Sequence, residues 1–431
     1  QGGAMATGPL PARAAALQAA VAGLAPGNAV SVRAPPPGGD ARLHTERGCS
    51  AGEALLAVPL ASCIASRDLD GHVLSAALPR SDGFGRLALA VLVLDPESDP
   101  RAAYFAAAAP PAHFDTSMMA CWPEGTPATR RLENSCAWRR ARSALDSCRE
   151  EHRALQRVGL HAPFGRYLWA KLLVQTRAFD SGGEHGHLLC PIFDLTNHAS
   201  PGHRNAKTKV VDGELRLLAT RDVAAGEEIT HCYDADADFL DLFERYGFFD
   251  ETNPVHTVEI SVPESALLSE DCADWRAADI RARIEQHAGP GDAWWVQAGN
   301  DSACHLVKAL RASLVDPVEY EEAKVRAQAQ GPGHDPLAEP IANEERVLAT
   351  LAELAERHLA AYSSSLSEDL RALQRAEAAW PGKVDESREE AAAREVEGLS
   401  LRVAIYEKGQ LNRLLGWLRG LRPQRAAPDP A

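Results

Sequence analysis

The sequence predicts an α+β fold in which strands come first, helices intervene, strands return, and an all-α domain ends the chain. Three observations support this fold class. Compact apolar runs bounded by glycine and proline occupy residues 43–64 and 188–233, helical periodicity fills much of the chain between them, and helical periodicity dominates after residue 262. At ~100–200 residues per domain, a chain of 431 residues is expected to form two or three units.

The composition argues against a membrane protein or a general nucleic-acid-binding protein. Apolar residues make up 45% of the chain and charged residues 24%, and no run approaches the ~20 apolar residues that a membrane span requires. Lys and Arg number 45 against 60 Asp and Glu, and the net charge of −15 repels phosphate backbones. We therefore expect a soluble protein with neither a membrane nor a nucleic acid as its partner. We also expect a monomer.

The nine cysteines are scattered and none stands in a C-x-x-C pair, which indicates free thiols in a reducing, intracellular compartment. Residues 1–5 are typical of a cloning remnant, so a transit or signal segment can have been removed. The sequence is therefore compatible with the chloroplast stroma, the cytoplasm and the nucleus alike.

The expected elements follow in chain order. Residues 10–24 carry apolar residues at helical spacing, which predicts an N-terminal helix. The run Ala54-Leu55-Leu56-Ala57-Val58 follows a glycine turn and ends at Pro59, which predicts a buried strand. Asp212-Gly213 is typical of a two-residue hairpin turn. Further helices are expected over residues 84–94, 141–155 and 164–174, and further strands over residues 188–195, 207–211, 215–219, 228–233 and 257–262.

One helical stripe stands out in the last third of the chain. Apolar residues recur at helical spacing over residues 348–373, with Glu and Arg on the opposite face. This amphipathic pattern predicts a helical C-terminal domain. The stripe comprises Leu348, Leu351, Ala355, Leu359, Tyr362, Leu366, Leu370 and Leu373.

These patterns divide the chain into four segments. Residues 1–27 hold the cloning remnant and the N-terminal helix, and residues 28–253 form a strand-containing domain with an inserted helical subdomain at about 75–180. Residues 254–422 form a mainly helical C-terminal domain, and residues 423–431 form a flexible tail.

Four short motifs place polar or aromatic residues where elements end. Taken singly, each is equally typical of a structural feature: a strand end, a hairpin, a core corner or a helix C-terminus. The motifs are Asp194-Leu195-Thr196-Asn197-His198 after an apolar strand, Gly226-Glu227-Glu228 before a strand that ends in Tyr233-Asp234, Tyr246-Gly247-Phe248, and Thr176-Arg177-Ala178-Phe179.

Taken together and in this order, the motifs resemble those of the SET-domain methyltransferases, and specifically the branch of Rubisco large-subunit methyltransferase-like enzymes. The resemblance spans nearly the whole chain and includes Glu46-Arg47-Gly48-Cys49-Ser50-Ala51-Gly52-Glu53. It implies a SET-domain β-fold for residues 28–253, with the helical insert of that branch, and a substrate-binding domain for residues 254–422. The zinc-binding cysteine cluster of histone-type SET enzymes is missing, as it is in this branch, so no metal is expected.

The resemblance further implies a protein-lysine N-methyltransferase that acts on a non-histone protein and uses S-adenosyl-L-methionine, with S-adenosyl-L-homocysteine as the product. Methyl transfer from a sulfonium is an in-line displacement, so catalysis depends largely on aligning the nucleophile and excluding water. Tyr233 is the implied catalytic residue. It would orient the amine rather than abstract a proton, because a phenol of pKa ~10 is a poor base at neutral pH.

The roles of the other residues come from the same resemblance. It implies Ala41, Arg42, Leu43, Arg177, Asn197, His198, Tyr233 and Phe248 at the cofactor, and Arg177, Ser181, Asp194, Lys207, Tyr233 and Tyr246 at the substrate. Two positions depart from the family pattern. Arg42 stands where the cofactor loop normally has glycine, and Lys207 stands near a position that is often aromatic and faces the substrate.

Three alternatives remain open at this stage. The same fold serves protein-histidine methyltransferases, and a catalytically silent relative would act as an interaction scaffold. A metal site is the third, because His185, His187, Cys190, His198 and His203 cluster together, although no paired C-x-x-C or H-x-x-x-H spacing is present. Members of the branch modify proteins such as the Rubisco large subunit, aldolase and ribosomal proteins, and the sequence does not select among these partners.

Overall fold

The chain divides into two units that are not continuous in sequence. The structure, a computed structural model, describes residues 28–33, 41–79, 82–181, 186–268, 274–289, 292–299, 304–331, 333–378 and 387–425, together with Leu17 and Gly23. Of these, the residues up to Trp122 and from Ala141 to Pro254 form unit 1. The residues from Pro123 to Arg140 and from Val255 onward form unit 2.

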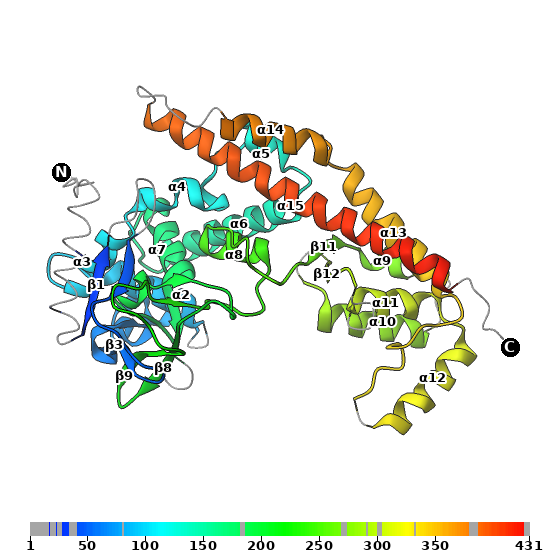
Figure 1. The fold of residues 1–431 in the computed structure, drawn as a ribbon, viewed down its shortest axis with the longest axis horizontal. Helices are drawn as coiled ribbons and strands as arrows, with labels where there is room; N and C mark the ends of the chain where they lie inside the picture. Colours follow the sequence, from blue (N-terminus) through cyan, green and yellow to red (C-terminus); the bar gives the residue numbers. More distant parts are fainter. Residues whose placement is uncertain are drawn as a thin grey trace. The chain divides into compact units, whose positions relative to one another are not determined.

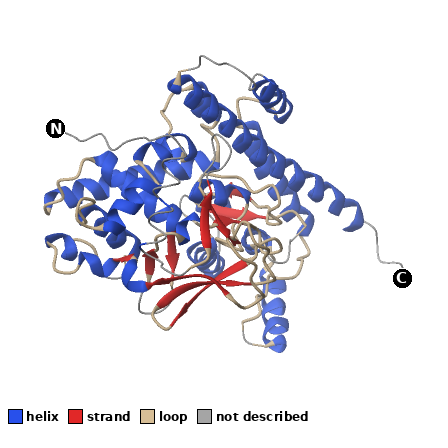
Figure 2. Cartoon of the chain, turned by 60° about the vertical axis from the view of Figure 1, so that its left-hand side comes forward, coloured by secondary structure: helices blue, strands red, loops and turns tan. Residues whose placement is uncertain are grey.

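Unit 1 contains several small sheets (Figure 2). Antiparallel strands form a sheet of order β3-β9-β8, a second of order β4-β6-β5, and the pair β1-β2, whereas β7 and β10 pair in parallel. The strands are β1 (Val30–Arg33), β2 (Arg42–Thr45), β3 (Ala54–Pro59), β4 (Ile64–Ala65), β5 (Ala178–Asp180), β6 (His187–Leu189), β7 (Asn197–His198), β8 (Ala206–Val211), β9 (Glu214–Ala219) and β10 (Thr230–His231).

The strand patterns explain the pairing. Buried and half-buried positions alternate along β9, as expected for a strand with one face on the core. The hairpin between β8 and β9 turns at Asp212 and Gly213, whose φ angles of 52° and 76° are both positive, so the predicted two-residue turn is confirmed. The chain between β6 and β7 bends at Ile192, which also has a positive φ of 76°.

The helices of unit 1 include most of the expected insert. The helix pair α2 and α7 packs within the same apolar core as β3, β4 and β6. The helices are α2 (Gly83–Val93), α3 (Pro100–Ala108), α4 (Phe114–Ser117), the part of α6 (Cys136–Arg157) that follows Arg140, α7 (Phe164–Arg177) and α8 (Phe239–Tyr246).

Unit 2 is mainly helical and has a core of its own. It also contains the antiparallel pair of β11 (Val258–Ser261) and β12 (Ala293–Val296). In Figure 1 the long helix α15 runs beside α13 and α14, with which it makes extensive contacts. The helices are α5 (Pro127–Arg131), α9 (Glu264–Leu267), α10 (Asp274–His287), α11 (His305–Leu314), α12 (Pro317–Gln330), α13 (Glu344–Ala360), α14 (Leu366–Ala378) and α15 (Arg388–Arg425).

Part of the expected insert groups with unit 2. Residues 123–140 contact α15, where Arg131 bonds the Glu397 carboxylate at 2.7 Å and the Ala137 amide donates to Glu407 at 3.1 Å. These charge-assisted hydrogen bonds link segments far apart in sequence, so helical periodicity alone could not assign residues 123–140 to their unit.

The stripe predicted over residues 348–373 is not one helix. Helix α13 ends at Ala360 and α14 begins at Leu366. The break has a local cause, because Ser365 and Glu368 form a capping box: the Glu368 carboxylate accepts from the Ser365 amide at 2.7 Å, and the Ser365 hydroxyl accepts from the Glu368 amide at 3.3 Å. Leu370, which belongs to the predicted apolar stripe, lies on α14 and is 42% exposed.

The two ends of the chain are described to different extents. Most of the predicted N-terminal helix lies outside the described residues, whereas the last helix is described up to Arg425. Of the helix predicted over residues 10–24, Leu17 and Gly23 are described and both are helical. Helix α15 extends to Arg425, past residue 423, where the flexible tail was expected to begin.

Gly247 is the C-cap residue of α8 and lies between two aromatic residues, Tyr246 and Phe248. Its φ is 81°, and a Cβ atom at this position would meet the Ser117 Cβ at 2.9 Å. Glycine is therefore required here both for the left-handed backbone and for the close approach of α4.

We predict that Gly247→Ala lowers the free energy of unfolding by at least ~3 kcal/mol, because backbone strain adds to a steric clash. Gly52→Ala is the matched control. Its φ is 89° and nothing lies within 4 Å of the added Cβ, so only the backbone term of ~1–2 kcal/mol applies. Urea unfolding measures both, and equal losses would show that the contact with Ser117 is unimportant.

Candidate active site

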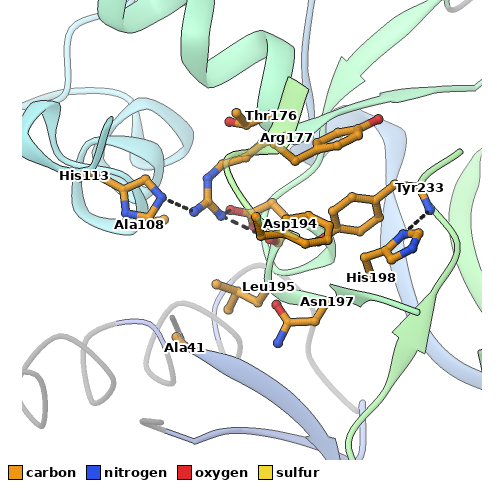
Figure 3. A pocket seen from close by; sticks show the side chains of 12 residues that line it. Ala41, Ala108, His113, Thr176, Arg177, Asp194, Leu195, Asn197, His198 and Tyr233 are labelled. Carbon is orange, nitrogen blue, oxygen red and sulfur yellow. Dashed lines mark hydrogen bonds and ion pairs between the residues drawn. The ribbon is translucent and has the colours of Figure 1, made fainter. Parts of the chain in front are cut away.

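Two cavities of unit 1 share a wall. Five residues line both of them: Thr176, Arg177, Asp194, Tyr233 and Tyr246. The first cavity is completed by Ala41, Ala108, His113, Leu195, Asn197, His198 and Phe248. The second is completed by Ala178, Phe179, Asp180, Thr196, Thr208, His231 and Cys232. Figure 3 shows the first cavity from close by.

The shared wall is built on a buried ion pair between Arg177, the last residue of α7, and Asp194. The Arg177 guanidinium donates to the Asp194 carboxylate at 2.8 Å and to its backbone carbonyl at 3.0 Å, and the Tyr104 hydroxyl donates to the same carboxylate at 2.6 Å. The Asp194 side chain is fully buried, and this burial raises its pKa. In Figure 3 the guanidinium lies between Asp194 and His113, whose Nε2 is 3.4 Å away.

Asn197 is held by a carboxylate. Its Nδ2 donates to Glu228 at 2.7 Å, and the other oxygen of Glu228 accepts from Arg42 at 3.1 Å. The link crosses between two strand ends, since Asn197 lies on β7 and Glu228 just precedes β10. Asn197 therefore has a fixed amide orientation, with Oδ1 left as the acceptor of that side chain.

Tyr233 is fixed at its backbone and at its hydroxyl. Its amide donates to the Nδ1 of His198 at 3.2 Å, and its hydroxyl donates to the Thr196 carbonyl at 2.8 Å. The second ring nitrogen of His198 lies 3.4 Å from the Asp250 carboxylate. Burial lowers the pKa of His198, so its Nδ1 is kept as an acceptor at neutral pH.

Several aromatic rings pack around the ring of Tyr233. The ring centroid of Tyr233 is 4.9 Å from that of Tyr246 and 6.0 Å from that of Phe248, and His198 packs on Phe248 at 5.5 Å. On the side of the second cavity, His231 is tilted against Tyr233 at 4.8 Å and stacks on Phe179 at 5.4 Å. Burial raises the pKa of Tyr246, which keeps that phenol neutral.

The structure brings most of the sequence-predicted site residues together. Ala41, Asn197, His198 and Phe248 line the first cavity, and Arg177, Asp194, Tyr233 and Tyr246 line both cavities. Seven of these eight lie in the short sequence motifs, and Ala41 was expected from the resemblance alone.

Four predicted residues line neither cavity. Arg42 points to solvent and pairs with Glu228, and Leu43 is a core residue whose carbonyl accepts from the Ile229 amide at 2.8 Å. The Ser181 hydroxyl donates to the Gly186 carbonyl at 2.6 Å. Lys207 is exposed on β8, and its neighbour Thr208 lines the second cavity instead, because successive side chains of a strand point to opposite faces.

Several lining residues were missed by the sequence analysis. Phe179 and Thr196 lie inside motifs that had been singled out, so a closer analysis of those motifs could have found them. His231 follows the Gly-Glu turn by only a few residues. Ala108 and His113 come from the helical insert, where no local pattern indicates proximity to β7 or β10.

The alternative of a metal site gains no support from the described part of the chain. Among those residues, no three His, Cys, Asp or Glu side chains gather in an arrangement that could hold a metal ion. His185, one of the five residues of the predicted cluster, lies outside the described residues. The helices that the structure describes include none long and apolar enough to cross a membrane.

Comparison with known proteins identifies the fold. The chain superposes on the crystal structure of the SET domain of LSMT bound to lysine and AdoHcy with a TM-score of 0.70 and 16% sequence identity, covering 97% of this chain and 93% of that one. The structure of Rubisco LSMT bound to AdoMet gives a TM-score of 0.67 and 16% identity, covering 96% and 93% of the two chains. The predicted fold class, a SET-domain fold with a helical C-terminal part, is thereby confirmed.

A comparison with protein-family models adds a match for part of unit 2. Residues 278–408, all within unit 2, match the family described as Rubisco LSMT substrate-binding. No curated protein sequence matches the chain. The predicted resemblance to the Rubisco LSMT-like SET methyltransferases therefore holds for the fold and for the C-terminal domain.

We predict that His231 makes the stability of unit 1 depend on pH. Burial lowers its pKa from 6.5 to about 3, so the unfolded chain binds a proton that the folded chain does not. Its contribution is complete above pH ~6.5 and is lost as the pH falls toward 3, which amounts to ~2 kcal/mol at pH 5.

The measurement is urea unfolding of the wild type and of His231→Leu at pH 7.5 and pH 5. The variant lacks the titrating group, so its loss of stability between the two pH values should be smaller by this amount. The comparison removes the contributions of other groups, Asp194 included. Equal losses in both proteins would contradict a neutral, buried His231.

Proposed function

We propose that the chain is an S-adenosylmethionine-dependent protein-lysine N-methyltransferase that acts on a non-histone protein. The observation that carries the proposal is the pair of cavities that share the Tyr233 wall. A group-transfer enzyme needs two substrates that meet at one point while water is excluded, and two cavities with a common aromatic wall provide that arrangement.

The first cavity fits the chemistry of S-adenosylmethionine. The cofactor carries a sulfonium and an ammonium, for which the aromatic faces of Tyr246 and Phe248 and the Oδ1 of Asn197 are suitable partners. Its carboxylate would lie toward Arg177, the cation of this wall. When bound there, the cofactor supplies an electrophilic methyl group.

The second cavity fits a lysine side chain. Phe179, Tyr233 and Tyr246 give it aromatic walls along the path of an alkyl chain, and such surroundings disfavour a charged ammonium. The Tyr233 hydroxyl already donates its hydrogen to the Thr196 carbonyl, so its oxygen accepts an N–H of the incoming amine. Tyr233 therefore orients the neutral amine, whose lone pair then attacks the methyl group.

Lysine is preferred over histidine as the acceptor because the similar LSMT structures contain lysine or methyllysine. A protein substrate is supported by the family match of residues 278–408 to a Rubisco LSMT substrate-binding domain. A narrow channel recognises little beyond one side chain, so recognition of the protein must come from contacts made elsewhere. We assign docking to unit 2.

The test of the function is methyl transfer into a cell or chloroplast extract. The chain is incubated with S-adenosylmethionine that carries a labelled methyl group, and the modified residue is identified by mass spectrometry. Label on lysine of a non-histone protein supports the proposal. Label on histidine supports a histidine methyltransferase instead, and no transfer by a chain that binds S-adenosylhomocysteine indicates a silent scaffold.

In the same assay, Tyr233→Phe is predicted to lower the rate of transfer by ~10²–10³-fold, because the acceptor for the amine N–H is lost from the transition state. The affinity for S-adenosylhomocysteine, measured by calorimetry, should stay within about threefold. Tyr320→Phe serves as the control, since it also removes one buried hydroxyl, which bonds Asp279 at 3.1 Å in unit 2. Full activity of Tyr233→Phe would sink the assignment.

Charge reversal on α13 tests docking. Glu353 and Glu356 are exposed, and the Glu356 contact with Arg419 at 3.8 Å is a surface pair that contributes little to stability. The double substitution Glu353→Lys and Glu356→Lys is predicted to lower kcat/KM for the protein substrate by roughly fivefold without changing cofactor affinity or Tm. The matched control reverses Asp146 and Glu150 on α6. Equal effects of the two double variants would contradict docking on α13.

A further inference from the structure

The second cavity contains one imidazole whose role the mechanism above does not use. His231 lies on β10, is 6% exposed, and packs between the rings of Phe179 and Tyr233. An aromatic channel for an alkyl chain needs no imidazole at this point. Its presence beside the tyrosine that orients the amine calls for a chemical explanation.

The ring has an unsatisfied hydrogen-bonding atom. The Nδ1 of His231 is buried and has no hydrogen-bond partner among the residues that the structure describes. A buried polar atom without a partner is costly, so a ligand that supplies one binds more tightly. Burial and the nearby His198 and Arg204 keep the pKa of His231 at about 3, so the ring is neutral and offers a lone pair at physiological pH.

A primary amine that is ready to attack has two N–H groups and one lone pair. If the Tyr233 oxygen accepts one N–H, a second acceptor on the channel wall is needed to fix rotation about the Cε–Nζ bond. When Cε and both N–H groups of the tetrahedral nitrogen are fixed in position, the direction of its lone pair is fixed as well. His231 lines the cavity next to Tyr233, and a neutral imidazole can supply such a second acceptor.

We propose that His231 is the positioning residue of the acceptor channel: its imidazole accepts an N–H of the substrate amine and, together with the Tyr233 hydroxyl, directs the lone pair toward the first cavity. The inference rests on the proposed function. His231 takes no proton and forms no covalent bond. The amine lone pair forms the new N–CH₃ bond as the S–CH₃ bond of S-adenosylmethionine breaks. The sulfur would keep that electron pair, which leaves S-adenosylhomocysteine, and the proton that the methylated ammonium then loses goes to solvent.

The arrangement also selects the methylation state. A monomethylated amine has a single N–H when neutral, so one of the two acceptors loses its partner when the product returns for a second reaction. We therefore expect monomethyllysine as the main product. Removal of the His231 acceptor should abolish this preference and raise the share of dimethyllysine.

The experiment measures binding of free L-lysine, N6-monomethyllysine and N6-trimethyllysine to the full chain saturated with S-adenosylhomocysteine. The variants are His231→Leu, which removes the acceptor, and His231→Gln, which retains an amide oxygen. We expect His231→Leu to weaken lysine by roughly tenfold and to leave trimethyllysine, which has no N–H, unchanged. His231→Gln should recover part of the lost affinity.

The outcomes distinguish a failure of the proposed positioning role of His231 from a failure of the proposed methyltransferase function. If the wild type does not bind S-adenosylhomocysteine, the proposed function fails. If the saturated wild type binds none of the amines, or if His231→Leu weakens all three equally, the positioning role is overturned, because a purely structural defect does not depend on the number of N–H groups. A loss confined to amines with N–H groups supports it.

Discussion

The site depends on the buried ion pair between Arg177 and Asp194. It forms part of both cavities, and Tyr104 extends it by donating to Asp194 and accepting from the Ile192 amide at 3.0 Å. Burial disfavours the charged carboxylate, and the hydrogen bonds from the Arg177 guanidinium and the Tyr104 hydroxyl offset that cost. Loss of one partner would leave an uncompensated charge at the point where α7 meets the segment that leads to β7.

Other residues of the site lie close to Asp194 along the chain, and this closeness fixes their positions relative to the ion pair. Asn197 and His198 follow Asp194 by three and four residues and form β7, whose parallel pairing with β10 places His231 opposite His198. His198 then accepts from the Tyr233 amide, and Glu228 fixes Asn197. A single chain segment therefore positions the wall of the first cavity and the tyrosine shared by both cavities. The aromatic rings after α8 complete the arrangement.

The sequence was sufficient to predict residues whose positions follow from local order. Arg177, Asp194, Asn197, His198 and Tyr233 stand at ends of elements, and their motifs bring them to one place. Lys207 was predicted to face the substrate, but it is exposed on β8, and the next residue, Thr208, lines the second cavity because successive side chains of a strand point to opposite faces.

Residues contributed from a distance could not be predicted in this way. His113 reaches Arg177 from the helical insert across a separation of 64 residues, and no periodicity reports such a contact. The division of α13 from α14 depended on a capping box at Ser365 and Glu368 that an otherwise continuous apolar stripe conceals. Apolar residues at helical spacing predict that a helix is present, but the ends of the helix depend on capping hydrogen bonds that this spacing does not indicate.

The central claim is that two reactants enter separate cavities and meet at Tyr233. A crystal structure of the chain with S-adenosylhomocysteine and L-lysine tests it most directly. The account predicts S-adenosylhomocysteine in the cavity lined by Ala41, Asn197 and Phe248, and the lysine side chain in the cavity lined by Phe179 and His231, with its Nζ within hydrogen-bond distance of the Tyr233 oxygen. Both ligands in one cavity, or a lysine amine remote from Tyr233, would contradict it.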